Sequence, residues 1–173
     1  ALSFNGRETA ACIVEGFTLT NGLAVKGGGI FGGSAGLTHA TIRNNVIYNN
    51  TATSQGGGVY GSQGVLAYNT IRGNQATGGA GLYVCSGQIE YNTIASNQAS
   101  GDGGAAAACS GTFERNTIQS NTAAGNGGAA SLCMATFEGN LIVGNQASGQ
   151  GGAFYQCSGP VRQNTISQNK AAM

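Results

Sequence analysis

A short motif, Asn-x-Ile-x-x-Asn, recurs through the chain and restricts its possible folds more than any other feature. Its first asparagine returns every 24 residues, with one interval of 23. An alanine and then a glycine cluster follow each copy, and a large apolar residue precedes the next copy by three positions. The copies begin at Asn45, Asn69, Asn92, Asn116, Asn140 and Asn164, after a degenerate copy at residues 16–22. A fixed period of this length predicts one stacked structural unit per repeat.

The apolar residues inside each repeat predict strands. A helix needs apolar residues at a spacing of three or four over ten or more positions, whereas these segments are short, alternating and interrupted by Gly and Asn. A repeat made only of strands forms one turn of a solenoid, with equivalent residues roughly 4.8 Å apart in successive turns. We therefore expect an all-β fold, a right-handed parallel β-helix of about seven coils. Residues 1–173 form one domain, with 1–11 as an N-terminal edge or cap and 12–170 as repeats.

Stacking predicts a role for each column of residues that recurs in the repeat. The isoleucines form an inward aliphatic ladder, and the alanines mark a narrow part of the core. Stacked asparagines are expected to form hydrogen-bonded ladders, and asparagine also tolerates the left-handed backbone of a sharp corner. The glycine clusters suit a second bend with positive φ. The isoleucine column is Ile47, Ile71, Ile94, Ile118, Ile142 and Ile166, and the alanine column is Ala52, Ala76, Ala99, Ala123, Ala147 and Ala171.

The composition argues against several function classes. Charged residues make up 8% of the chain, against about 25% in ordinary domains, and the net charge is +1. The seven Lys and Arg are scattered and form no basic stripe, so no nucleic-acid partner is expected. No apolar run approaches the roughly 18 residues of a membrane-spanning helix. Two Gly-x-Gly-x-x-Gly matches, at 27–32 and 56–61, belong to the glycine turns, so no nucleotide cofactor is expected.

Four cysteines fall one coil apart and should also form a column. A line of thiols does not offer the tetrahedral arrangement that zinc requires, so no metal site is expected. Inter-coil disulfides have a plausible Cα separation but poorly directed Cβ vectors, and a column of small buried thiols is the favoured interpretation. The column is Cys85, Cys109, Cys133 and Cys157, with Cys12 outside it. The single His39 has no visible nucleophile partner for a catalytic triad.

The candidate site residues are three stacked glutamates and their neighbours. Glu90, Glu114 and Glu138 recur one coil apart and alternate outward, with Arg162 next in the column and Arg115 beside it. A second column pairs two tyrosines, whose rings can stack on sugars. These residues, with Tyr68 and Tyr91, are the predicted ligand-binding residues. The glutamates are also the only candidates for acid and base catalysis, but a solvated structural ladder is the favoured interpretation of the column.

Other exposed columns suggest further binding hypotheses. Threonines at 18, 70, 93, 117 and 165 form an outward column that Val46 and Leu141 interrupt. A flat threonine array suggests ice binding, but the adjacent column is irregular where a second threonine column would be expected. A second tyrosine column combines Tyr60, Tyr83 and Tyr155.

The repeat also resembles known families. Gly-Gly-Ala at 103–105, 127–129 and 151–153, with Phe-x-x-Asn at 113–116 and 137–140, resembles the repeats of chlamydial polymorphic outer-membrane proteins. The wider pattern is similar to pectate-lyase-like β-helices of secreted bacterial proteins. The resemblance implies an extracellular or cell-surface location. Lyase activity in that class implies a cluster of acidic calcium ligands, whereas this chain has a single Asp, Asp102.

Three functional hypotheses follow. The first is a non-catalytic, adhesin-like module for binding or display, which contacts carbohydrate or another protein. The alternative is a polysaccharide-active lyase or hydrolase, with the three glutamates as acid and base. Ice binding is the third. The nearly constant coil length, without a long inserted loop, favours the first hypothesis. Because little sequence follows Asn169 to cover the last strands, we also expect end-to-end self-association or a longer parent solenoid.

Overall fold

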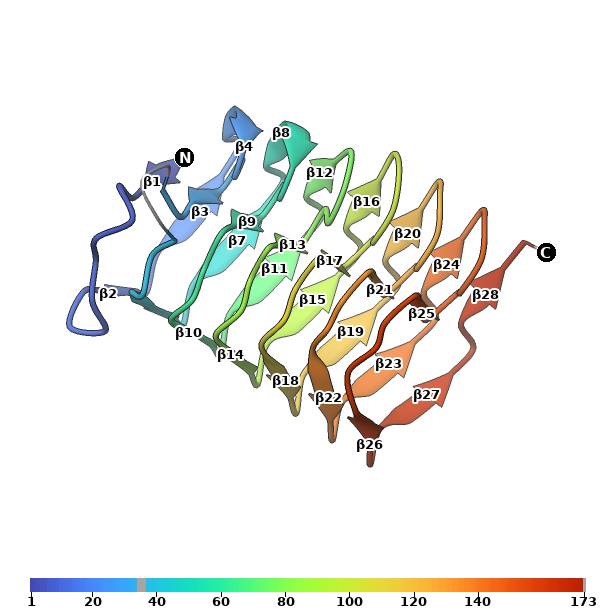
Figure 1. Cartoon of the computed structure of the whole chain (residues 1–173). Helices are drawn as coiled ribbons and strands as arrows, with labels where there is room; N and C mark the ends of the chain where they lie inside the picture. The colour runs from blue at the N-terminus through green and yellow to red at the C-terminus, as the bar shows by residue number, and fades with distance from the viewer. Residues whose placement is uncertain (34–36, 173) are drawn as a thin grey trace.

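The computed structural model describes residues 1–33 and 37–172, and these form a right-handed parallel β-helix. Each coil passes through four short strands, and the coils stack into four parallel sheets of seven strands each. Figure 1 shows the coils side by side, with the chain advancing along the solenoid from the N-terminal to the C-terminal end. The described residues contain no helix, so the predicted all-β fold is confirmed.

The four sheets are named in the order in which the first coil enters them. Sheet I contains β1 (Leu2–Ser3), β5 (Ile30–Phe31), β9 (Val59–Tyr60), β13 (Leu82–Tyr83), β17 (Ala106–Ala107), β21 (Ala130–Ser131) and β25 (Phe154–Tyr155). Sheet II contains β2 (Ile13–Glu15), β6 (Thr41–Arg43), β10 (Val65–Ala67), β14 (Gln88–Glu90), β18 (Thr112–Glu114), β22 (Thr136–Glu138) and β26 (Val161–Arg162).

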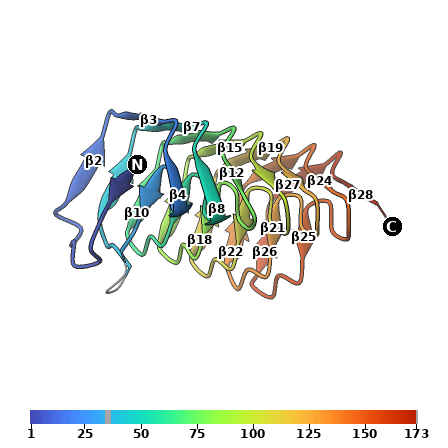
Figure 2. The ribbon, with the colours of Figure 1, turned by 90° about the horizontal axis from the view of Figure 1, so that it is seen from above.

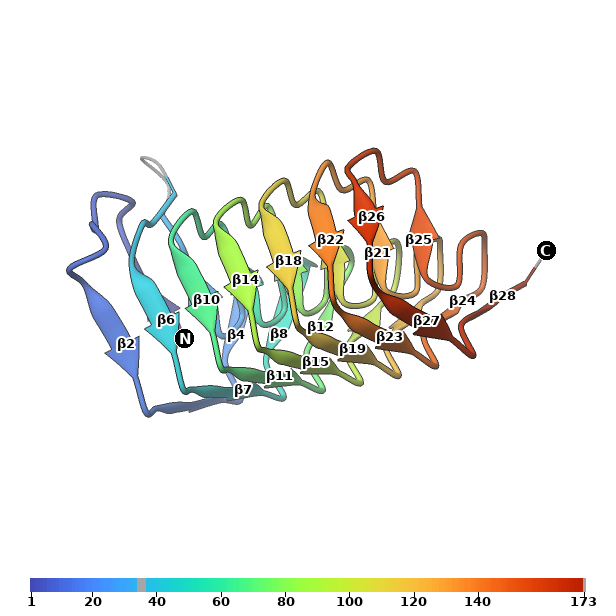
Figure 3. The same ribbon diagram turned by 90° about the horizontal axis from the view of Figure 1, so that it is seen from below.

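The other two sheets follow along each coil. Sheet III contains β3 (Thr18–Thr20), β7 (Val46–Tyr48), β11 (Thr70–Arg72), β15 (Thr93–Ala95), β19 (Thr117–Gln119), β23 (Leu141–Val143) and β27 (Thr165–Ser167). Sheet IV contains β4 (Leu23–Lys26), β8 (Thr51–Gln55), β12 (Gln75–Ala76), β16 (Gln98–Ala99), β20 (Thr122–Ala123), β24 (Gln146–Ala147) and β28 (Lys170–Ala171). Figure 3 shows the strands of sheets II and III as two adjoining rows.

Successive coils pair in register, which places the predicted columns inside and outside as expected. The isoleucine column of sheet III is buried from Ile47 to Ile142, and sheet II adds a second buried column that includes Phe113 and Phe137. These two rings stack with their centroids 4.6 Å apart. In the last coil, Ile166 is 45% exposed because no further coil covers it. The two termini lie at opposite ends of the solenoid (Figure 2).

Two buried asparagine ladders run along the corners that flank sheet III. In each ladder, the Oδ1 atom of one asparagine accepts hydrogen bonds from both the backbone N–H and the Nδ2 of the asparagine one coil earlier. For Asn116 and Asn140 these bonds measure 2.8 and 3.0 Å. The Nδ2 of Asn140 also donates to the carbonyl of Phe113, at 2.8 Å. The side-chain oxygen and nitrogen atoms of the ladder asparagines therefore all have hydrogen-bond partners. These hydrogen bonds permit a polar residue to be buried at each corner. The predicted ladders are confirmed.

The backbone part of the asparagine prediction is wrong by one residue. The left-handed position at each corner is occupied by the residue before the ladder asparagine, for example Tyr68 with φ of 56° and Arg115 with φ of 52°. The ladder asparagines themselves have no positive φ. A ladder asparagine must direct its amide inward, and the bend that achieves this falls on its outward-facing neighbour. Positive φ in the glycine turns is confirmed, for example at Gly103 and Gly127.

On one side of the solenoid, the alanine column of sheet IV packs directly against the glycine segment of each coil. We call this thin two-layered region the flange. Ala52, Ala76, Ala99 and Ala123 form a small apolar cluster of their own, separate from the main core. Behind them the glycine segment returns to sheet I, close to the backbone of sheet IV. A Cβ atom placed on Gly28 would lie 2.6 Å from the carbonyl oxygen of Thr51, nearer than real Cβ contacts allow. Only glycine and alanine fit between these two layers, as the sequence indicated.

The first coil differs from the others in length. Thr18 pairs with Val46, an offset of 28 residues, and the register of β4 against β8 shifts between Ala24 and Lys26. Residues 1–11 include β1, which pairs with β5 as the outermost strand of sheet I.

Candidate ligand-binding surfaces

The predicted glutamate column lies on the corner where sheet II turns into sheet III. Glu90, Glu114 and Glu138 end β14, β18 and β22 and pair in register, with partly exposed side chains. Arg162 occupies the next place, and its Nη2 lies 3.8 Å from Glu138 Oε2. Arg115 Nη1 lies 2.9 Å from Glu114 Oε1. The carboxylates thus belong to an exposed row of charges in which arginines neutralise part of the repulsion.

A tyrosine–arginine stack runs beside the glutamates. Tyr68 and Tyr91 stack nearly parallel, with ring centroids 5.0 Å apart. The Arg115 guanidinium continues the stack at 5.6 Å from the Tyr91 centroid, and its Nη1 donates a 2.6 Å hydrogen bond to the Tyr91 hydroxyl. This hydrogen bond raises the pKa of Arg115 above its usual value. Tyr68 remains 56% exposed and Tyr91 39% exposed, so both rings are accessible in part at the surface.

The corner explains why these side chains point outward together. All three members of the stack occupy the left-handed position before a ladder asparagine, which holds the backbone by its buried amide. The seven predicted binding residues therefore form one continuous surface, which we call the ridge. It comprises Tyr68, Glu90, Tyr91, Glu114, Arg115, Glu138 and Arg162.

A second charged cluster lies in the same column nearer the N-terminus, separated from the ridge by the buried Ala67. Glu15 pairs in register with Arg43, and Arg43 Nη2 lies 2.9 Å from Glu15 Oε2. Asn44 Nδ2 donates a hydrogen bond of the same length to Glu15 Oε1. These hydrogen bonds, from Asn44 first and then Arg43, lower the pKa of Glu15. This pair was not identified from the sequence, because the first coil is longer. Glu15 and Arg43 are 28 residues apart and therefore depart from the regular spacing of the repeat.

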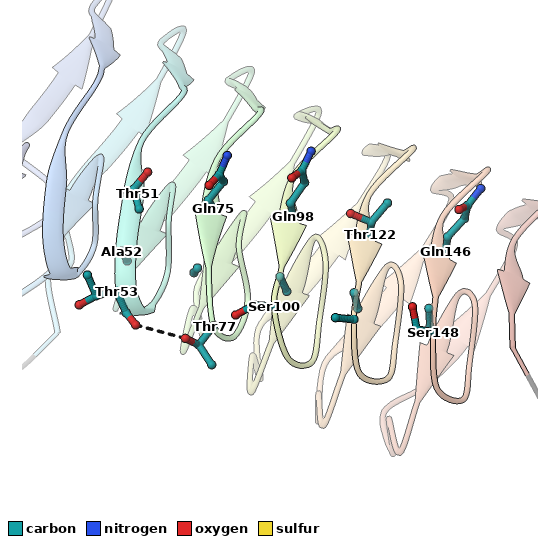
Figure 4. A pocket seen from close by; sticks show the side chains of 15 residues that line it. Thr51, Ala52, Thr53, Gln75, Thr77, Gln98, Ser100, Thr122, Gln146 and Ser148 are labelled. Atoms are coloured by element: carbon teal, nitrogen blue, oxygen red, sulfur yellow. Dashed lines mark hydrogen bonds between the residues drawn. The ribbon is translucent and has the colours of Figure 1, made fainter.

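A groove of about 730 Å³ runs along the outer face of sheet IV. Sheet III lies between the groove and the ridge along each coil. Its floor is the backbone of the alanine column, and two outward columns, two residues apart, form its walls (Figure 4). The first wall is Thr51, Gln75, Gln98, Thr122 and Gln146. The second wall is Thr53, Thr77, Ser100, Ala124 and Ser148.

The chemistry of the groove is polar and uncharged. The residues that line it include no aromatic and no ionisable side chain. In the first wall the long amides of Gln75 and Gln98 extend side by side (Figure 4), and neither makes a hydrogen bond within the described residues. In the second wall, Thr77 Oγ1 donates to the carbonyl of Thr53 at 3.2 Å. Sequence reasoning missed the groove, although the recurring Asn-Gln-Ala tripeptides beginning at Asn74, Asn97 and Asn145 were its visible signal.

The cysteine column lies at the corner between sheets I and II. Cys85, Cys109 and Cys133 are buried free thiols, as predicted, whereas Cys157 in the last coil is a partly exposed free thiol. Burial and the adjacent thiols raise the pKa of Cys109 well above its usual value. The thiols lie in line, and within residues 1–33 and 37–172 no group of three His, Cys, Asp or Glu side chains is arranged to hold a metal ion.

Asp102 has a structural role at the glycine turn between sheets IV and I. Its Oδ1 accepts hydrogen bonds from the backbone N–H of Asn126, at 2.6 Å, and from the Asn126 Nδ2, at 3.2 Å. Asn126 Oδ1 accepts in turn from the N–H of Gln150, at 2.8 Å. This is a third, shorter side-chain ladder. It requires glycine at 125 and 149, where a Cβ atom would overlap the ladder oxygens.

The remaining predicted columns fall where the register places them. The threonine column lies on the outer face of sheet III, interrupted by Val46 and Leu141. The column beside it is irregular, and the Arg72 guanidinium lies 4.7 Å from the Tyr48 ring centroid there. Tyr60 and Tyr83 stack on sheet I with centroids 5.8 Å apart. His39 lines a shallow polar hollow of about 480 Å³ beside sheet II.

The comparisons with known proteins support the fold. A family model described as a right handed beta helix region matches residues 2–147, so the chain belongs to this family. Neither the curated proteins nor the solved structures give a match. The described part of the chain has no helix of the length and apolar character needed to cross a membrane.

Proposed function

We propose that this right-handed β-helix is a non-catalytic module for binding or structural display, which contacts carbohydrate or another protein through the ridge. The observation that carries the proposal is the clustering of all seven candidate residues on one exposed corner. Two partly exposed tyrosine rings lie beside three stacked carboxylates and the guanidinium groups of Arg115 and Arg162. Tyrosine and arginine are the residue types that concentrate binding energy at protein surfaces.

The shape of the ridge favours binding over catalysis. Hydrolysis or elimination on a polysaccharide needs the reacting bond held in a fixed position against the catalytic acid and base, which a cleft provides. The ridge is an outer corner of the solenoid, and none of the hollows described above is lined by Glu90, Glu114 or Glu138. Two of these glutamates also pair with arginines. The carboxylates recur once per coil, at a spacing of about 4.8 Å, which is the one feature that favours the enzyme alternative.

The proposal includes an extracellular or cell-surface, adhesin-like setting in a bacterium. It rests on the resemblance of the Gly-Gly-Ala and Phe-x-x-Asn repeats to chlamydial surface proteins and to secreted pectate-lyase-like proteins. End-to-end contact between copies, through unpaired strand edges, belongs to the same proposal. Sedimentation velocity over a hundredfold range of concentration tests self-association, and a constant monomer mass would contradict it.

A glycan and protein array, run beside a reducing-sugar release assay, tests the main proposal. We expect binding without sugar release by the native chain, and loss of binding in a Tyr68→Ala/Tyr91→Ala variant. Tyr48→Ala is the matched control, because Tyr48 is an outward tyrosine on sheet III that is not part of the ridge. Sugar release that Glu114→Gln abolishes would replace the proposal with the enzyme alternative.

A further inference from the structure

The groove on sheet IV presents uncharged side chains once per coil over five consecutive coils, and Ala124 is the one apolar residue of its two walls. Because successive coils are about 4.8 Å apart, its walls extend for roughly 19 Å along the solenoid axis. Each coil adds one side chain to each wall, and the first wall carries amides at Gln75, Gln98 and Gln146. A ligand that uses this pattern is a linear polymer whose own repeat is close to the coil spacing.

The amide groups are free to serve such a ligand. The backbone N–H and carbonyl groups of the floor are already engaged in the ladder between coils, as in Gln98 N–H to Asn74 O at 2.9 Å and Thr122 N–H to Asn97 O at 2.9 Å. Specific hydrogen bonds must therefore come from the walls. A glutamine amide offers two donors and an accepting oxygen, which matches the mixed donors and acceptors of neighbouring hydroxyl groups.

The charge of the groove indicates an uncharged ligand. No acidic or basic side chain lines it, and the first charged residue in line with the amide wall is Lys170, beyond Gln146. An anionic polymer would find no series of guanidinium or ammonium partners along its length. The ridge, in contrast, presents both signs of charge.

The spacing separates an extended glycan from an extended peptide. Side chains on one face of a β-strand repeat at about 6.8 Å, which exceeds the coil spacing by about 2 Å and puts a peptide out of register after two or three coils. An extended pyranose chain advances by close to one coil spacing per sugar and stays in register. The two wall columns, with Cα atoms about 6.8 Å apart on the same strand, would contact such a chain along both of its edges as it lies over the face of the sheet.

We propose that the groove on sheet IV binds a single uncharged, extended polysaccharide chain that runs parallel to the solenoid axis, with about one sugar per coil. The amides of Gln75, Gln98 and Gln146 hydrogen bond to its hydroxyl groups, and the threonine and serine hydroxyls of the second wall line its other edge. This site is separate from the ridge and does not depend on the function proposed for the ridge.

Calorimetric titration of the full chain with defined oligosaccharides tests the inference. The probes are the disaccharides, tetrasaccharides and hexasaccharides of β-1,4-linked glucose, mannose and xylose, with hexagalacturonate as the charged comparison. We expect at least one neutral hexasaccharide to bind at least tenfold more tightly than its disaccharide, because the longer chain spans more coils. Hexagalacturonate should bind at least tenfold more weakly than that hexasaccharide. Absence of binding by all three neutral hexasaccharides, or affinity independent of length, would overturn the inference.

Three variants locate the binding. Gln98→Ala removes a central amide and should weaken hexasaccharide binding about tenfold, and Ser100→Trp should abolish it by filling the groove. Gln119→Ala is the matched control, because Gln119 is an outward glutamine on sheet III, outside the groove. Equal losses in Gln98→Ala and Gln119→Ala would refute the placement. A Tyr68→Ala/Tyr91→Ala variant should keep hexasaccharide binding, and its loss there would assign the sugar to the ridge instead.

Discussion

The ridge and the groove are built on the same repeat, yet they present opposite chemistry. The ridge is an exposed corner where charges and rings contact one another, whereas the groove is a concave face of uncharged side chains whose amides at Gln75 and Gln98 make no hydrogen bond within the described residues. A buried asparagine ladder borders each surface, one before sheet III and one after it. The comparison shows that the ladders and the core determine only where the outward side chains lie. The identity of those side chains determines what each surface can bind.

Ile118→Asn should break both surfaces at once and have the largest effect. Ile118 is buried in sheet III, on the strand that joins the two ladder corners of its coil. The change removes an aliphatic side chain from the core and buries an amide without partners, at a cost of roughly 5 kcal/mol in the free energy of unfolding. Urea unfolding followed by circular dichroism measures it, with Gln119→Asn as the outward-facing, partly exposed control on the same strand. A variant that lost only one binding activity would show that the surfaces are independent.

Asn116→Ala and Asn121→Ala should destabilise the two corners by similar amounts. Each change leaves the N–H and the Nδ2 of the preceding ladder asparagine without their acceptor, Oδ1. The loss of several buried hydrogen bonds costs about 3 kcal/mol in each case. Urea unfolding gives both values. A difference of more than about 2 kcal/mol would mean that the ladder beside the ridge and the ladder beside the groove are not equivalent.

Gly104→Ala should affect the groove and spare the ridge. A Cβ atom at position 104 would overlap the carbonyl oxygen of Gly128 and lie 2.8 Å from that of Thr122, which is part of the groove wall. Forcing this thin flange apart costs about 1–3 kcal/mol. Amide hydrogen exchange should accelerate in β16 and β20 but not in β18. Gly78→Ala is the control, because its nearest contact would be an ordinary 3.5 Å, to the Tyr83 ring. Equal acceleration in sheet II would contradict a locally weakened flange.

The period of the sequence was sufficient to predict the fold and the residues of the ridge. Because equivalent residues stack, any column at constant spacing could be placed without a structure, and Glu90, Glu114 and Glu138 were placed in this way. Glu15 and Arg43 were missed because the longer first coil breaks the spacing. The left-handed corner residue was misassigned because the pattern identifies which residues recur, and does not say which of two neighbours turns the backbone.

The groove could not be predicted for a different reason. Its glutamines recur beside the alanine column, but an exposed amide has no partner in the sequence that would mark it as functional. What makes the groove is the combination of two outward columns and a flat backbone floor. That floor depends on the glycine segment packing directly behind sheet IV, which is a three-dimensional property.

Glu114→Gln should have the smallest effect and separates the two surfaces by their response to salt. The change removes an exposed ion pair with Arg115 and also relieves repulsion from the adjacent carboxylates, so the two contributions oppose each other. Exposed pairs contribute little, and we expect a change within about 0.5 kcal/mol in the free energy of unfolding. Partner binding by the ridge should weaken with added salt in the native chain and respond less to salt in this variant. Hexasaccharide binding in the groove should be insensitive to salt in both proteins. A large loss of stability would mean that the glutamate column is buried, and a strong salt dependence of hexasaccharide binding would mean that charges take part in the groove.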